Sequence, residues 1–254
     1  MIEIIKCKIE GEIAVLTFNR PKVNAINAEF VNQLQSHLEL LIHDKRINGI
    51  ILTGSPGFFS AGLDVVELFP LGKKDIQEFW AKFNRLLITL FTCPKLIFSA
   101  ISGHSPAGGT VLAIMTDYRI MNSGNYKIGL NEVAVGLTLP GAIGEVFQYL
   151  LGTRNAEKYA LTGSLLTPET ALAAGLIDEI CEPENMLETT KNRLKDWLKL
   201  PSVQQGLTKL KMRKKIASRM ENDFEKDTAE IVSIWFNKSG REVLGNLVKN
   251  LTNR

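Results

Sequence analysis

Two adjacent glycines, Gly108 and Gly109, open the apolar stretch SPAGGTVLAIMTDYRI, which is typical of a buried helix. The first N–H groups of a helix have no acceptor inside it, and they point outward with the positive end of the helix dipole. Glycine lets a ligand oxygen come close to these groups. They could therefore stabilise an oxyanion, alone or with an N–H from the region of Leu63. The same glycines could instead serve only to pack the helix tightly against a strand.

Three glycine-containing loops follow stretches with strand patterns, at residues 56–65, 103–111 and 129–141. Open α/β sheets usually bind ligands at the carboxyl ends of their strands, so these loops are candidates for one shared site. The third loop carries Glu132, which is either a proton-transfer group or a solvated or capping carboxylate. None of the loops matches GxGxxG or GxxxxGKS/T, so phosphate binding of those kinds is not supported.

The chain around these loops alternates strand and helix patterns up to about residue 140. Gly11 is expected at the turn of an N-terminal hairpin formed by residues 2–9 and 12–19. Apolar residues at helical spacing predict a helix over 27–45. Short apolar runs predict further strands at 49–54, 95–103, 117–122 and 126–130. A helix is predicted between the first two of these, at 75–92. This alternation predicts an α/β fold with a mostly parallel sheet.

Helical patterns dominate beyond residue 140, apart from a strand expected at 176–181. The predicted helices cover 141–151, 154–162, 184–199, 202–219 and 221–238. Helices that have no sheet of their own to cover often cover a neighbouring subunit, so we expect an oligomer.

The composition excludes several classes of function. The 30 basic and 27 acidic residues nearly balance, with a net charge of +3, so bulk charge does not indicate a nucleic-acid partner. Three cysteines without a CxxC pair and three histidines without HExxH predict reduced thiols and no metal site. No apolar run approaches the ~20 residues that span a membrane. The N-terminal residues resemble no targeting peptide, so the expected location is the cytoplasm.

Five motifs in one order resemble those of the crotonase (enoyl-CoA hydratase/isomerase) superfamily. They are NRPKVNAI, FFSAGLDV, SPAGGTVLAIMTDYRI, GLNEVAVGLTLP and LTGSLLTPETALAAGLIDEIC. The resemblance implies a crotonase (ClpP-like) α/β fold of repeated ββα units over residues 1–195. It further implies a C-terminal α-helical trimerisation region over residues 196–254, and hence a homotrimer or a dimer of trimers.

The resemblance also implies a ligand and a site. Members bind acyl-CoA thioesters and stabilise a thioester enolate with two peptide N–H groups, which by motif position belong here to Leu63 and Gly108. Further contacts with the substrate or its coenzyme A are implied at Val23, Ala25, Ser60, Ala61, Asp64, Gly109 and, from a late helix, Trp235. Coenzyme A is part of the substrate, and no other cofactor, metal, nucleic acid or membrane is expected.

One position departs from the hydratases of this superfamily, which carry a glutamate where this chain has Val111. Glu132 matches their second glutamate. Adding water needs one group to activate water and an acid to protonate C2, whereas moving a double bond needs one carboxylate that shuttles a proton from C2 to C4. With IGLNE and MRKKIASRM, this pattern resembles mitochondrial-type Δ3,Δ2-enoyl-CoA isomerases. The alternatives are an enoyl-CoA hydratase or other acyl-CoA enzyme, and a non-catalytic CoA- or RNA-binding member.

Other charged residues are expected to have structural roles. Asp64 is predicted to cap a helix or order its loop, and Asp117 and Arg119 to pair at a helix–strand junction. Glu145 is a weaker candidate for a second acid, and His104 is expected to be packed within its loop. The basic cluster at 209–219 is either a solvated helix face or a contact for the phosphates of coenzyme A.

Two further expectations concern the site itself. An apolar wall from Val111 and its neighbours should raise the pKa of Glu132. A side chain at Gly108 should harm catalysis more than one at Gly109, because only the Gly108 N–H is assigned to the thioester oxygen.

Overall fold

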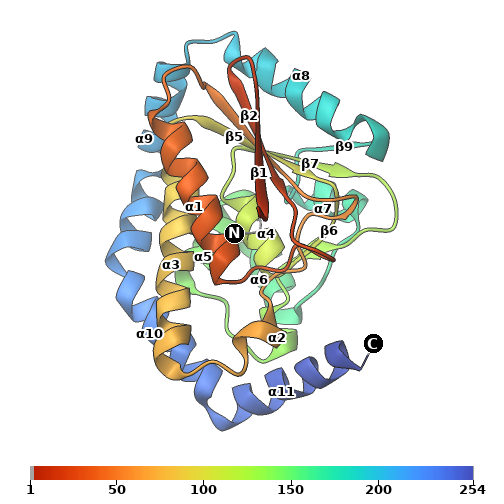
Figure 1. The fold of residues 1–254 in the computed structure, drawn as a ribbon, viewed down its shortest axis with the longest axis vertical. Helices are drawn as coiled ribbons and strands as arrows, with labels where there is room; N and C mark the ends of the chain where they lie inside the picture. Colours follow the sequence, from red (N-terminus) through yellow and green to blue (C-terminus); the bar gives the residue numbers. More distant parts are fainter. Residues whose placement is uncertain (1–2, 254) are drawn as a thin grey trace.

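The computed structural model describes residues 3–253, and its main layer is a six-stranded sheet (Figure 1). The strand order is β1-β2-β3-β5-β7-β9, with bounds Ile5–Glu10, Ile13–Phe18, Gly49–Thr53, Leu96–Ile101, Tyr118–Asn122 and Glu179–Cys181. Strands β1 and β2 are antiparallel and the other neighbours are parallel, as predicted. Gly11 has a φ of +62°, the left-handed conformation that suits the tight hairpin turn.

A second, smaller sheet holds the three candidate loops together. It contains β4 (Gly57–Phe58), β6 (Gly103–Pro106) and β8 (Ile128–Gly129), paired in parallel with β6 in the middle. Each of these strands follows one strand of the large sheet and precedes helical structure. The predicted crotonase fold of repeated ββα units is therefore confirmed. Because the three short strands are parallel neighbours, the loops after them meet at one edge.

Helices cover both faces of the large sheet. Helices α1 (Ala28–His43) and α3 (Lys73–Thr92) pack on one face, and α8 (Met186–Leu198) packs against the other (Figure 1). Short α2 (Val65–Leu68) and α4 (Gly108–Ile114) follow β4 and β6. Beyond β8 come η1 (Glu132–Val135), α5 (Gly141–Leu151), α6 (Thr153–Thr162), α7 (Pro168–Ala174) and η2 (Pro183–Asn185). None of the helices among the described residues has the length and apolarity to cross a membrane.

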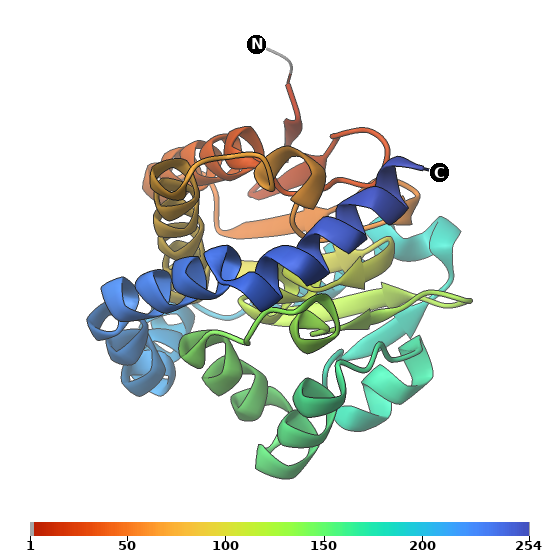
Figure 2. The same cartoon turned by 90° about the horizontal axis from the view of Figure 1, so that it is seen from below.

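The C-terminal part is helical, with α9 (Ser202–Asn222), α10 (Phe224–Phe236) and α11 (Lys238–Thr252). Figure 2 shows α11 crossing the molecule, and it contacts α2 and η1. The sequence patterns missed α7 and α11. Helix α11 contains Gly240 and Gly245, which lower helix propensity, yet Gly240 is required because a Cβ there would clash with the Ile234 carbonyl oxygen. The predicted core region (1–195) and helical region (196–254) each extend slightly beyond the described residues, by residues 1–2 and by residue 254.

The predicted pair of Asp117 and Arg119 is wrong, because each has another partner. Asp117 accepts the Ile97 N–H at 2.7 Å and faces α9, where it pairs with Lys209 (2.7 Å) and Arg213 (3.0 Å). Arg119 pairs at 2.6 Å with Asp178, which lies between α7 and β9.

The cluster at 209–219 therefore combines inward and outward cations. The side chains of Asp117, Lys209 and Arg213 are all under a tenth exposed. Arg213 also donates to the carbonyl oxygens of Phe91 (2.9 Å) and Thr116 (3.1 Å). Neither of the two predicted roles, solvated face or phosphate contact, describes these two cations, which join α9 to the core.

We expect Asp117→Ala to lower the free energy of unfolding by roughly 3–5 kcal/mol, because it leaves two buried cations without a counter-charge. Asp196→Ala is the matched control, since it removes an exposed pair with Lys199 and should cost less than about 1 kcal/mol. Urea unfolding of both variants makes the comparison. Equal costs would show that the buried cluster does not hold α9 in place.

Candidate active site

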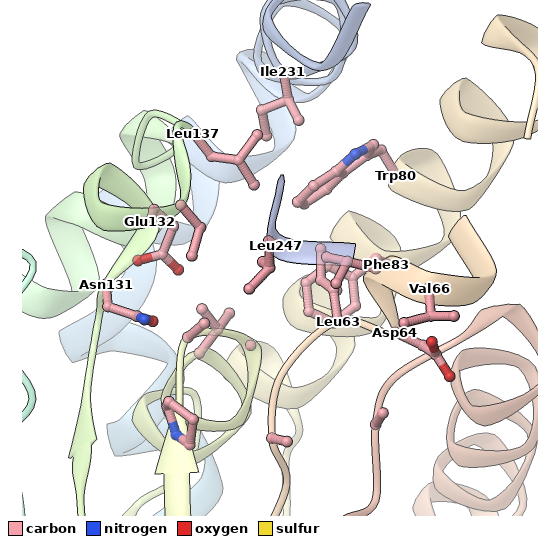
Figure 3. Close-up of a pocket in the computed structure, with 18 of the residues that line it drawn as sticks. Leu63, Asp64, Val66, Trp80, Phe83, Asn131, Glu132, Leu137, Ile231 and Leu247 are labelled. Atoms are coloured by element: carbon pink, nitrogen blue, oxygen red, sulfur yellow. The ribbon is translucent and has the colours of Figure 1, made fainter. Parts of the chain in front are cut away.

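One apolar cavity of about 410 Å³ opens where the loops after β4, β6 and β8 meet (Figure 3). Its floor contains Leu63, Gly108 and Glu132 from the three loops. Bulky side chains from three helices complete the wall: Trp80 and Phe83 of α3, Ile231 and Ile234 of α10, and Leu247 and Leu251 of α11. The sequence analysis singled out none of these six residues, because their role depends on how distant helices pack, and it missed the helix that carries Leu247 and Leu251.

Two backbone N–H groups on this floor are unpaired. Among the described residues, no acceptor takes a hydrogen bond from the N–H of Leu63 or of Gly108. The two loops touch, because a Cβ built on Gly108 would lie 3.4 Å from the Leu63 nitrogen. Ala107 precedes α4 with a φ of +46°, a strained conformation for alanine, and its N–H is held by the Gly129 carbonyl at 2.9 Å. The geometry suits two donors to one oxygen of a ligand.

The two adjacent glycines have different roles. Gly108 lines the cavity, and an added Cβ would first meet the end of the Ile26 side chain at 3.1 Å. Gly109 lies behind it, and an added Cβ would clash with the backbone carbonyl of Ser60. Tight packing therefore explains Gly109. Gly108 is also closely packed, since its added Cβ would lie 3.2 Å from the Gly62 Cα, but it lines the cavity as well. A substitution at Gly109 is not the mild change that the sequence alone suggests, because it would displace backbone next to the site.

Glu132 begins η1 and points its carboxylate into the cavity (Figure 3). Its Oε2 is buried and has no hydrogen-bond partner. Val111, which is 2% exposed, forms part of the apolar wall. Burial raises the pKa of Glu132 from its usual value of 4.5 to about 7, the direction that the sequence predicts. A carboxylate with a pKa near neutrality is well suited to accept a proton and return it.

The other predicted contacts divide into two groups. Val23, Ala25, Ala61 and Asp64 line the cavity, whereas Ser60, Gly109 and Trp235 do not. Ser60 is buried behind the wall, where its hydroxyl donates to the Asn24 carbonyl at 2.7 Å. Trp235 is fully buried in the core, so the acyl contact predicted for it falls instead to its helical neighbours on α10.

Asp64 is the second carboxylate at the cavity, and it is already engaged. It accepts the Glu67 N–H at 3.0 Å as the N-cap of α2, as predicted. It also pairs with Arg20 at 2.7 Å. These contacts leave Glu132 as the carboxylate with a free oxygen in the cavity.

The weaker candidates lie elsewhere. Glu145 pairs with Arg219, and the His104 ring packs against Phe58 and Tyr126; neither residue lines the cavity. Within residues 3–253, no cluster of three or more His, Cys, Asp or Glu side chains could hold a metal ion.

Two asparagines near the site were missed. Asn24 adopts a φ of +52° and donates to the carbonyl oxygens of Phe58 (3.1 Å) and Phe59 (3.2 Å). It thereby holds the loop that leads to Leu63. Asn131 lines the cavity beside Glu132, and its Oδ1 is buried without a partner. The sequence marked these asparagines only in that Asn24 lies in the motif NRPKVNAI and Asn131 in GLNEVAVGLTLP.

Comparisons with known proteins agree with this architecture. Residues 8–244 match the model of the enoyl-CoA hydratase/isomerase family. The chain is 36% identical to "Enoyl-CoA delta isomerase 1, mitochondrial" of Rattus norvegicus, over 88% of this chain and 79% of that protein. It is 30% identical to a short-chain-enoyl-CoA hydratase of Clostridium acetobutylicum, over 72% and 70%. The crystal structure of human mitochondrial delta3-delta2-enoyl-CoA isomerase superposes with a TM-score of 0.96, at 32% identity over 98% of each chain.

The raised pKa of Glu132 makes a prediction about stability. The folded state favours the protonated carboxyl, so this contribution is complete below pH 4.5 and is lost as the pH rises through about 7. Glu132→Gln should therefore be more stable than the wild type at pH 8, by roughly 2–3 kcal/mol, and gain far less at pH 5. Urea unfolding at both pH values measures this. A gain that is the same at both would mean that Glu132 titrates normally.

Proposed function

Because this chain belongs to the enoyl-CoA hydratase/isomerase family, we propose that it is a Δ3,Δ2-enoyl-CoA isomerase. It converts a 3-enoyl-CoA into the trans-2-enoyl-CoA, a step in the β-oxidation of unsaturated fatty acids. The substrate is an acyl-CoA thioester, and the chemistry is proton transfer that requires no cofactor beyond the coenzyme A of the substrate.

The reaction uses the three groups on the cavity floor. The N–H groups of Leu63 and Gly108 donate to the thioester oxygen, which lowers the cost of removing a proton from C2. Glu132 takes that proton, and the electrons spread over the oxygen and the C2–C4 unit as a dienolate. The protonated Glu132 then gives the proton to C4, so that the double bond lies between C2 and C3 and the carboxylate is restored.

The observation that supports isomerisation over hydration is that the apolar cavity is lined by Glu132 and by a valine, Val111, at the position where the hydratases carry a second glutamate. Water addition needs a group to activate water as well as an acid. The only other carboxylate among the residues that line the cavity is Asp64, which is bound by Arg20 and by the N-terminus of α2. One carboxylate that serves first as base and then as acid is sufficient for a double-bond shift.

An enoyl-CoA hydratase is the second candidate, since the Clostridium acetobutylicum relative is a hydratase by name. One spectrophotometric comparison separates the two functions: isomerisation of trans-3-enoyl-CoA against hydration of trans-2-enoyl-CoA. We expect the wild type to favour the first. Hydration faster than isomerisation would reject the proposal.

Assembly through residues 196–254 remains a prediction. Helix α9 exposes apolar side chains, among them Val203, Leu207 and Met212, which are 54–68% exposed. An exposed apolar surface of this kind supports the proposed trimer.

Glu132→Gln should abolish isomerisation and leave the affinity for the thioester nearly unchanged, because glutamine keeps the volume but cannot accept a proton. Stopped-flow kinetics and calorimetric binding of a saturated acyl-CoA measure the two effects. Retention of more than about a tenth of the wild-type kcat, a loss below ~1.4 kcal/mol, would exclude Glu132 as the base.

Val111→Glu should introduce weak hydration of 2-enoyl-CoA, because it supplies the carboxylate that water activation lacks. Val111→Gln is the matched control, since it adds similar bulk without a base. Both variants are assayed by the loss of the 2-enoyl absorbance, at matched folded fractions. Equal rates in the two variants would show that the missing carboxylate does not limit hydration.

A further inference from the structure

A second, small cavity of about 20 Å³ lies behind the wall of the main one. Pro140 and Ile143 line both cavities. Such a volume holds about one water molecule. Its remaining walls are mostly apolar, with Leu87 and Ile88 of α3 and Met220 of α9 among them. The two cavities are therefore neighbours that share a wall formed by the start of α5.

The small cavity continues the main one along the same two helices. Helix α3 lines the main cavity with Phe83 and the small one with Leu87, one turn further on. Helix α10 lines the main cavity with Ile231 and the small one with Asp227, again one turn away. A chain that fills the main cavity between α3 and α10 and grows longer is thus directed toward the small cavity.

The main cavity also has a direction. Its wall is unequally buried: Leu251 is 47% exposed, whereas Trp80 and Ile143 are only 5% and 3% exposed. In Figure 3 the cavity extends past Glu132 toward Leu137, Ile231 and Trp80. The proposed oxyanion donors, Leu63 and Gly108, lie on the floor beside Glu132. An acyl chain held by its thioester oxygen therefore extends toward the buried end.

We propose that Ile143 is the specificity-determining residue that closes the buried end of the acyl cavity and sets the longest chain that fits. The inference rests on the proposed function in that it takes an acyl-CoA as the ligand. Pro140 shares the wall, but its ring is part of the backbone turn before α5. The Ile143 side chain is thus the movable part of the partition.

Small residues surround this partition. Gly141 and Gly144 lie near and next to Ile143 in α5. Ala142 lines the small cavity but not the main one. Ile143→Ala removes the three carbon atoms beyond Cβ, so the two cavities join without any movement of the backbone. The joined cavity has room for about three further carbon atoms plus the space of about one water molecule.

Calorimetric binding of saturated acyl-CoAs of increasing length tests this proposal without requiring turnover. In the wild type each added methylene should strengthen binding roughly fourfold, until the chain reaches Ile143 and the gain stops. In Ile143→Ala the gain should continue for about three more carbon atoms. Ile143→Val, a milder change, should extend it by about one. Ala142→Leu in the Ile143→Ala background refills the small cavity and should restore the wild-type limit.

The outcomes separate this inference from the proposed function. If the wild type binds no acyl-CoA, the proposed function fails. If the wild type shows a length limit that folded Ile143→Ala and Ile143→Val leave in place, the partition inference alone fails. A shifted limit that Ala142→Leu does not reverse would also reject it, because the added length would then lie outside the small cavity. Thermal unfolding of each variant establishes that it is folded.

Discussion

The site depends on keeping polar groups without protein partners inside an apolar cavity. A buried carboxylate oxygen, and N–H groups that face an apolar cavity, cost free energy when they are unpaired. The structure keeps Glu132 Oε2 and the N–H groups of Leu63 and Gly108 in this state. A substrate that brings an oxygen for the N–H groups and an acidic proton for the carboxylate supplies what the protein leaves unpaired. The same burial that makes the site costly moves the pKa of Glu132 toward neutrality.

The repeated ββα unit explains how three distant segments supply these groups. Each unit ends its short strand at the same edge, because β4, β6 and β8 are parallel neighbours. Further hydrogen bonds set the loop conformations: Gly129 O accepts the Ala107 N–H, and the side-chain amide of Asn24 donates to the carbonyl oxygens of Phe58 and Phe59. The site is thus positioned by backbone pairing and by the Asn24 side chain, neither of which lies among the side chains of the cavity wall.

The floor of the site could be predicted from sequence, and its walls could not. Leu63, Gly108 and Glu132 lie in local motifs directly after strands, where short-range patterns carry the information. Trp80, Ile231 and Leu247 come from helices that meet only through long-range packing. The pattern around Trp80 and Ile231 is that of any core helix, and the helix of Leu247 was not predicted at all. The predicted acyl contact of Trp235 illustrates this. Its helix, α10, does line the cavity, but it does so with Ile231 and Ile234, whereas Trp235 is buried in the core. The pairing of Asp117 with α9 was hidden for the same reason.

Buried arginines and one of the two proposed oxyanion donors, the Gly108 N–H, lie at opposite ends of the same helix. Gly108 begins α4, and the carbonyl groups just past its C-terminus, at Met115 and Thr116, accept hydrogen bonds from Arg213. Arg119 donates to the Thr116 carbonyl as well, at 3.0 Å. Cations at the C-terminus of a helix and an anion at its N-terminus are both favoured by its dipole. The arginines that contact the carbonyl groups past α4 therefore fix the end of this helix opposite Gly108, which couples the C-terminal helices to the floor of the site.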